Sequence, residues 1–124
     1  MQRNYSGYEI KNRIKVLQEL SKHGFDPLYE RIILEHITYQ YPDDRKAPPV
    51  FSAEIVGELH DDGVQAVVVK INGSWTRPDG KIFHVTYSLS NGHKPAESNI
   101  LIKRFGVKNI NIIEPPIELT IESF

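Results

Sequence analysis

The sequence predicts an α+β domain over residues 1–124, with helices near the N-terminus and a mostly antiparallel β-sheet after them. One observation is that apolar residues recur at helical spacing near the start of the chain, between residues 10 and 20. The other is that short segments rich in β-branched and aromatic residues alternate with glycine and proline turns from residue 35 on. A length of 124 residues is ordinary for one domain, so we expect no second core.

The first helix is predicted to begin after Ser6 and to end at Gly24. Ser6 and Glu9 fit a capping box, in which the serine hydroxyl accepts a hydrogen bond from the Glu9 N–H and the Glu9 side chain reaches back. The apolar stripe of this helix consists of Ile10, Ile14, Val16, Leu17 and Leu20. A short second helix is expected next, with Asp26 as its N-cap and Pro27 in the first helical position.

The rest of the chain is predicted to form strands joined by turns. The segments 60–63, 72–73 and 77–80 carry the glycine, asparagine and proline residues typical of turns. One or two helical turns are expected over residues 97–105, ended by Gly106, and Pro115-Pro116 is expected to separate the last two strands. The six predicted strands cover residues 35–41, 51–59, 64–71, 81–89, 109–114 and 117–122.

The composition argues against several functional classes. Fifteen Lys and Arg residues against sixteen Asp and Glu residues give a net charge of −1, without the basic excess of proteins that coat long nucleic acids. The absence of cysteine excludes disulfides, thiolate metal sites and a cysteine nucleophile. No apolar run approaches the roughly 18 to 20 residues that span a bilayer, and the polar start of the chain shows no secretory leader. We therefore expect a cytoplasmic protein with no membrane partner.

Cofactor motifs are also missing from the sequence. The five histidines show none of the close spacings that metal sites use, and no glycine-rich phosphate loop occurs. The chain has neither a Gly-x-Ser-x-Gly motif nor a dinucleotide-binding fingerprint. We expect no metal and no other cofactor.

The strongest signal is an internal repeat. His36-Ile-Thr-Tyr39 recurs as His84-Val-Thr-Tyr87, 48 residues further along the chain. The chain has only five histidines and four threonines, so two His-x-Thr pairs would arise in about 1% of shuffled chains.

Strand geometry gives this repeat a chemical meaning. Side chains alternate between faces along a strand, so His36 and Thr38 project together, as do His84 and Thr86. Two such strands side by side would place two imidazoles and two hydroxyls around one small cavity. Two histidines near pH 7 can act as general acid and base, and two hydroxyls can hold the oxygens of a tetrahedral anion. The alternative is that the repeat is merely favourable strand composition.

The paired tetrads resemble the signature of the 2H phosphoesterase superfamily. This superfamily includes LigT-like RNA ligases and phosphodiesterases, cyclic phosphodiesterase domains of fungal and plant tRNA ligases, and phage enzymes that cleave cyclic oligonucleotide signals. The resemblance implies a compact bilobal α+β fold with one tetrad in each half. By position, it implies that His36 and His84 are the acid/base pair and that Thr38 and Thr86 bind the phosphate. The 48-residue gap is shorter than is usual in the superfamily, which implies a reduced first lobe.

Three further side chains are candidates for substrate binding. Trp75, the single tryptophan, is suited either to stack on a nucleobase or to pack at the rim of the cleft. Tyr5 offers a similar platform if the N-terminal segment folds over the site. Lys94 follows the second tetrad and is suited to neutralise a phosphate, whereas Ser98 is expected to cap the following helix.

These observations predict a metal-independent phosphodiesterase that acts on a nucleotide. The expected substrate is small, either a 2′,3′-cyclic phosphate or a cyclic oligonucleotide signal, and not a long double-stranded nucleic acid. A phage enzyme that degrades a bacterial immune signal in the host cytoplasm would fit the resemblance. One alternative is a non-catalytic module that sequesters a nucleotide in the same cleft. Another is a structural protein in which the repeat is accidental.

Overall fold

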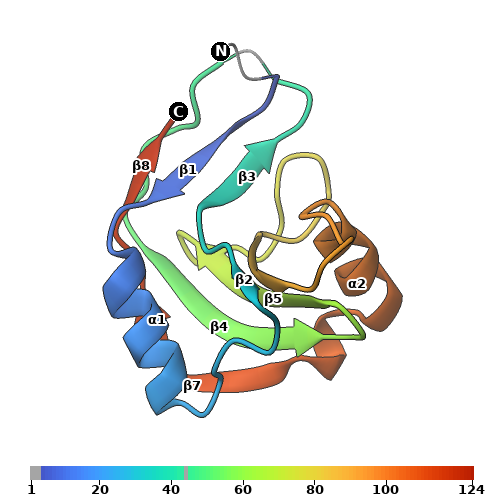
Figure 1. The fold of residues 1–124 in the computed structure, drawn as a ribbon. Helices are drawn as coiled ribbons and strands as arrows, with labels where there is room; N and C mark the ends of the chain where they lie inside the picture. The colour runs from blue at the N-terminus through green and yellow to red at the C-terminus, as the bar shows by residue number, and fades with distance from the viewer. Residues whose placement is uncertain (1–3, 44) are drawn as a thin grey trace.

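The computed structural model describes residues 4–43 and 45–124 and contains two antiparallel sheets and two α-helices (Figure 1). The larger sheet has the order β2-β6-β5-β4-β7, and the smaller sheet has the order β3-β1-β8. The α+β class and the antiparallel pairing predicted from the sequence are confirmed. Neither helix is long and apolar enough to cross a membrane. The elements are β1 (Ser6–Ile10), α1 (Arg13–Lys22), β2 (Arg31–Ile32), β3 (His36–Gln40), β4 (Ala53–His60), β5 (Val64–Ile71), β6 (His84–Leu89), α2 (Glu97–Phe105), the 3₁₀ turn η1 (Val107–Asn109), β7 (Asn111–Glu118) and β8 (Ile121–Ser123).

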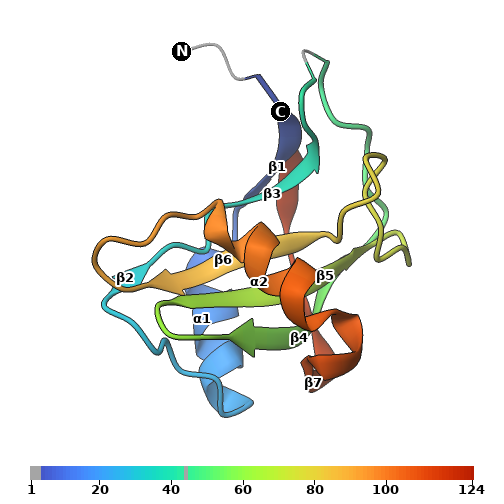
Figure 2. The same ribbon diagram turned by 90° about the vertical axis from the view of Figure 1, so that its right-hand side faces the viewer.

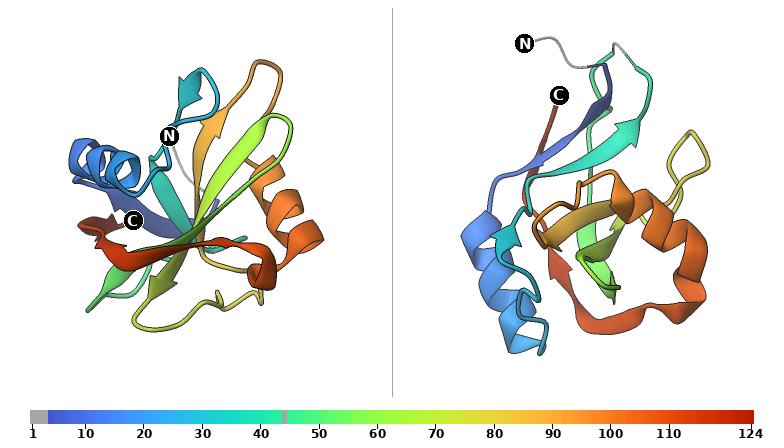
Figure 3. Two further views of the ribbon diagram at one scale, coloured as in Figure 1. Left: turned by 90° about the horizontal axis from the view of Figure 1, so that it is seen from below. Right: turned by 45° about the vertical axis from the view of Figure 1, so that its right-hand side comes forward.

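The two helices cover opposite faces of the larger sheet, as Figures 2 and 3 show. Strand β5 supplies side chains to both faces because successive residues of a strand point in opposite directions. Val67 packs in the same apolar cluster as Leu20 of α1. Its neighbour Val68 packs in a second cluster with Leu101 of α2. The sheet is therefore buried on both sides, and the smaller sheet lies beyond one end of it (Figure 1).

The start of the chain differs from the prediction, because strand β1 occupies the residues assigned to a helix N-terminus. The helix begins at Arg13, and the capping box at Ser6 is not formed. The Ser6 hydroxyl instead donates a hydrogen bond to Asp43 Oδ2 at 2.8 Å. Gly7 lies so close to the Ile37 carbonyl that a Cβ atom would clash with it. This segment is a strand and not a helix because it pairs with both β3 and β8. Neither of these partners is near it in the sequence.

The predicted second helix is also absent. Gly24 ends the first helical segment as expected, with φ of 87°. The segment that starts at Asp26-Pro27 then runs without helical structure to β2. Its backbone is held by side chains of the larger sheet, for example by a 3.0 Å hydrogen bond that the Leu28 N–H donates to Gln65 Oε1. These bonds replace the backbone pairs that a helix would provide.

The C-terminal strands have a different boundary from the predicted one. Strand β7 runs without interruption through Pro115 and Pro116, and β8 follows after a short break. Because β7 pairs only with β4, it is an edge strand, and an edge tolerates residues that lack an N–H. The β4–β5 hairpin, the three predicted turns and α2 with its end at Gly106 agree with the prediction.

Candidate active site

The two copies of the repeat lie in different sheets. His36 and Thr38 are on β3, at one edge of the smaller sheet, whereas His84 and Thr86 are on β6 in the larger sheet. Strands β3 and β6 pack against each other but are not hydrogen-bonded neighbours. The sequence predicts two strands side by side, and the structure brings them together at a junction of sheets instead.

The chain passes from one sheet to the other at Leu34. The Ile33 N–H donates to the Tyr87 carbonyl at 2.8 Å, and the Leu34 N–H donates to the Thr86 carbonyl at 3.0 Å, so this segment runs beside β6. Leu34 has φ of 46°, in the left-handed region that non-glycine residues rarely adopt. Its side chain is completely buried, which holds this conformation in place. His36 therefore lies two residues from a backbone group that is bonded to the other strand.

All four repeat side chains line one cavity of about 390 Å³. The alternation of strand side chains explains their common direction. The intervening residues Ile37 and Val85 are completely buried in the apolar core. The complete lining of the cavity consists of Asn4, Tyr5, Ile33, His36, Thr38, Tyr41, Arg77, Lys81, His84, Thr86, Pro95, Ala96 and Asn99.

The His84 imidazole is held in one tautomer. Its Nδ1 atom lies 2.9 Å from the Ile82 carbonyl, which can only accept, so Nδ1 carries the proton and Nε2 is the basic nitrogen. Burial lowers the pKa of His84 to about 4, and the positive charges of Arg77, His36 and Lys81 act in the same direction. The hydrogen bond to the Ile82 carbonyl opposes this shift. His84 is therefore neutral at pH 7.

The His36 imidazole lies among aromatic rings. Its Nε2 atom is 3.4 Å from the Tyr5 hydroxyl, and the two ring centroids are 5.5 Å apart. The Phe124 ring approaches His36 edge-on, with centroids 6.3 Å apart. Tyr5 was a candidate from the sequence, and the structure places it in the cavity wall beside a repeat histidine.

The two threonine hydroxyls differ in their surroundings. Thr86 Oγ1 lies 2.8 Å from Ser98 Oγ and 3.2 Å from the Pro95 carbonyl. Thr38 is only half-buried, and its hydroxyl has no hydrogen-bond partner among the described residues. Ser98 was expected to be an N-cap, but it lies inside α2, is completely buried and bonds to Thr86, while Ala96 occupies the cap position. The cap prediction is therefore wrong.

Two cations at the cavity were missed by the sequence analysis. Arg77 is only 4% exposed and lines the cavity. Its Nη2 atom lies 2.5 Å from Asp79 Oδ2, whereas its buried Nε–H has no acceptor within the described part of the chain. Lys81 lines the same cavity, and no Asp or Glu among the described residues does. The only sequence signal for Arg77 was its turn, Arg77-Pro-Asp-Gly80, which local backbone chemistry explains without any reference to a site.

Trp75 and Lys94 do not line the cavity, so their predicted contact with it is not seen. Trp75 packs against the α2-side apolar cluster, and the Lys70 ammonium lies 4.9 Å from its ring centroid. The Lys94 side chain is exposed, and the backbone N–H of Lys94 donates to Glu97 Oε2 at 2.5 Å. Backbone bonding to the start of α2 therefore directs this loop, and only Pro95 and Ala96 bring it to the cavity.

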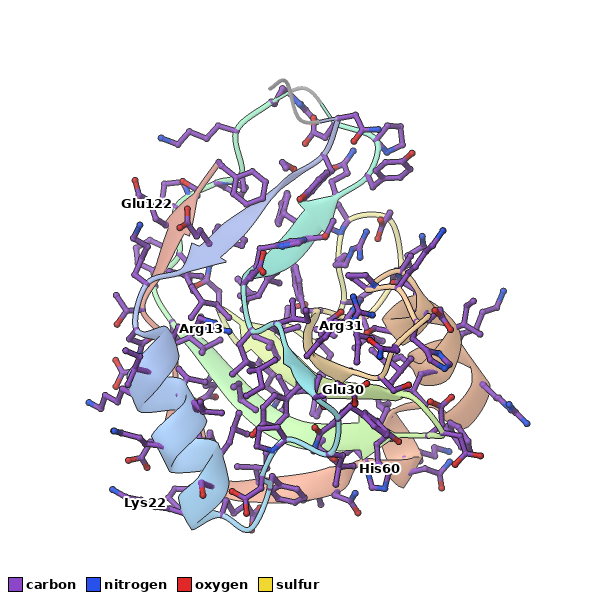
Figure 4. The ribbon with its side chains drawn as sticks, viewed as in Figure 1. Arg13, Lys22, Glu30, Arg31, His60 and Glu122 are labelled. Atoms are coloured by element: carbon purple, nitrogen blue, oxygen red, sulfur yellow. The ribbon has the colours of Figure 1, made fainter. Side chains whose placement is uncertain are left out.

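The loop between β6 and α2, which reaches the cavity at Pro95 and Ala96, is held by hydrogen bonds nearer to β6. Arg31, labelled in Figure 4, extends from β2 towards this loop. Its Nη2 atom donates to the Ser90 carbonyl at 3.1 Å and to the carbonyl of His93. His93 Nδ1 lies 2.9 Å from Glu97 Oε1. These bonds fix the approach of α2 to the site.

Comparison of the chain with protein-family models, with curated proteins and with solved structures finds no significant match.

Proposed function

We propose that this protein is a metal-independent phosphodiesterase of the 2H type that cleaves a nucleotide or a short oligonucleotide. The observation that supports this most is the lining of one cavity by both histidines and both threonines of the repeat, together with Arg77. A cavity with fixed positive charge and two imidazoles is suited to an anion that needs both an acid and a base. On this proposal, the two sheets correspond to the two lobes of a compact 2H fold, and the nucleotide substrate is met in the cytoplasm.

The surroundings of the two histidines favour different roles. We assign His84 as the general base, because it is neutral and its Nε2 atom is free of the proton. His36 is then the general acid. The base takes a proton from the attacking oxygen, either water or a ribose 2′-hydroxyl, as the new P–O bond forms. The P–O bond to the leaving oxygen breaks, and His36 protonates that oxygen.

The remaining groups act on the non-bridging phosphate oxygens. The Thr38 hydroxyl is available to donate to one of them, and the Arg77 guanidinium is suited to a second as the charge on phosphorus develops. Thr86 is better described as a positioning residue, since its hydroxyl joins β6 to Ser98 at the start of α2. This role differs from the direct phosphate contact that the family resemblance implies.

The test is incubation with 2′,3′-cyclic mononucleotides, cyclic dinucleotides and cyclic trinucleotides, followed by chromatography. His36→Ala and His84→Ala should each lower kcat by about 10²- to 10⁴-fold while the protein stays folded. His60→Gln is the matched control, because His60 ends β4 outside the cavity. Full activity in either cavity variant would remove that histidine from the mechanism.

A non-catalytic nucleotide-binding module is the second candidate. The observation that favours it is the engagement of the Thr86 hydroxyl by Ser98, which leaves one fewer free donor for a transition state. In that case calorimetry would detect nucleotide binding, and no product would form with wild-type protein. Product formation that depends on both histidines would exclude this candidate.

A further inference from the structure

A second, more apolar groove adjoins the candidate active site. It has a volume of about 640 Å³ and lies between the turn that contains Asp79 and one side of α2. Lys81, His84 and Asn99 line both the groove and the cavity, so the two spaces adjoin at His84. The groove falls within the range of about 300 to 1,000 Å³ that is typical of small-molecule sites.

The groove walls carry aliphatic side chains, of which Ile100 and Val107 are exposed and Ile82 packs partly against the apolar cluster under α2. Ile82, Ile100 and Val107 form this wall, and Ile100 is 66% exposed. A solvent-exposed aliphatic surface beside a catalytic cavity is suited to the face of a flat, weakly polar ligand. A nucleobase has such a face, and apolar side chains commonly sandwich one.

The charges at the groove suit a polyanion. Lys81 and Lys103 line it, and neither ammonium has an ion-pair partner among the residues that the structure describes. The one carboxylate in the lining, Asp79, already pairs with Arg77. A nucleotide with its base on the aliphatic wall would meet Lys103 in the groove and Lys81 where the groove adjoins the cavity.

We infer that this groove binds the nucleoside whose ribose 2′-hydroxyl attacks the phosphate, so that the substrate is an RNA-type 3′–5′ internucleotide phosphodiester. The inference rests on the proposed function and on the place of His84 between the groove and the cavity. His84 takes the 2′-hydroxyl proton, and O2′ forms a bond to phosphorus. The P–O5′ bond breaks, and His36 protonates the departing 5′-oxygen. The products are a 2′,3′-cyclic phosphate and a 5′-hydroxyl, with no water consumed.

The experiment compares a 3′–5′ diribonucleotide, a linear stand-in for cyclic oligonucleotides, with a mononucleoside 2′,3′-cyclic phosphate. Wild-type protein should cleave the diribonucleotide at least about tenfold more efficiently in kcat/KM, with a 2′,3′-cyclic phosphate as the first product. Ile100→Glu should lower kcat/KM for the diribonucleotide about tenfold, because it places a carboxylate on the aliphatic wall. Ile14→Glu is the control, since Ile14 is similarly exposed but lies on α1, on the other face of the larger sheet.

The outcomes distinguish failure of the groove assignment from failure of the proposed function. Hydrolysis of the cyclic mononucleotide with no cleavage of the diribonucleotide would overturn the groove assignment and leave the proposed function standing. Unchanged diribonucleotide cleavage in Ile100→Glu would also overturn it. If neither compound is cleaved, the proposed function fails, and the groove is tested by binding of a 2′-O-methyl dinucleotide. Methyl NMR shifts at Ile82 and Ile100 would then support the groove, and their absence would refute it.

Discussion

Acidification should leave the proposed general base working well below the pH at which an ordinary histidine fails. Burial beside Arg77 and Lys81 from the preceding turn, with His36 opposite on β3, lowers the pKa of His84 to about 4. At pH 5 about 90% of His84 is then neutral, whereas about 3% would be neutral at the ordinary pKa of about 6.5. The expected difference in kcat/KM at pH 5 between these two cases is about 30-fold.

The assay is kcat/KM from about pH 3 to pH 8 at constant ionic strength, with circular dichroism at each pH to confirm folding. The acidic limb should lie near pH 4 to 5, below the range of 6 to 8 in which two unperturbed histidines would centre the profile. An NMR titration of the His84 ring should give the same pKa as the limb. An acidic limb between pH 6 and 7 that His84→Gln abolishes would refute the assignment of a neutral, buried base.

The other predictions concern the phosphate contacts, the metal independence and the close approach of two strands. Thr38→Ala should lower kcat about 10²- to 10³-fold without unfolding the protein, because an oxyanion-type donor is lost. Equal kcat values for the variant and the wild type would show that the Thr38 hydroxyl is not used. Arg77→Met should lower kcat/KM about 10²-fold and move the acidic limb to higher pH, because one of the cations that depress the pKa of His84 is removed; a purely structural role would leave the limb in place. Excess EDTA should not change the rate, and inactivation that zinc or manganese reverses would disprove the two-histidine mechanism. Gly7→Ala should lower the free energy of unfolding by about 1 to 3 kcal/mol in urea titrations, because the alanine Cβ would clash with the Ile37 carbonyl. A change of less than about 0.5 kcal/mol would mean that β1 and β3 can move apart freely.

The features that the sequence predicted well depend on local periodicity. The common face of His36 and Thr38 follows from the two-residue repeat of a strand, and the buried Ile37 between them agrees with it. The β4–β5 hairpin was predictable because its turn residues and both apolar strands are consecutive. Such signals need no knowledge of which distant segments meet.

The features that the sequence missed depend on long-range pairing. Ser6 and Glu9 match a helix start, but the partners of β1 come from the middle and the end of the chain, and these partners form a sheet. Arg77 looked like an ordinary turn residue, because its burial and its place in the cavity come from packing against other segments. The prediction for Lys94 failed for a local reason instead: its backbone N–H is bonded to the Glu97 side chain three residues on, and the Lys94 side chain is exposed outside the cavity.

The turn at Leu34 affects how much conformational entropy the protein loses when it binds a ligand. Because this buried residue carries the chain directly from the side of β6 into β3, the two strands that carry the repeat are held together by a short connection and not by a long flexible loop. The relative position of His36 and His84 is therefore largely set before any ligand arrives. Because a preorganised pair of this kind does not have to be assembled on binding, the protein loses less conformational entropy when the ligand binds. On the proposed function, the strained backbone of one leucine would serve affinity and rate as well as chain direction.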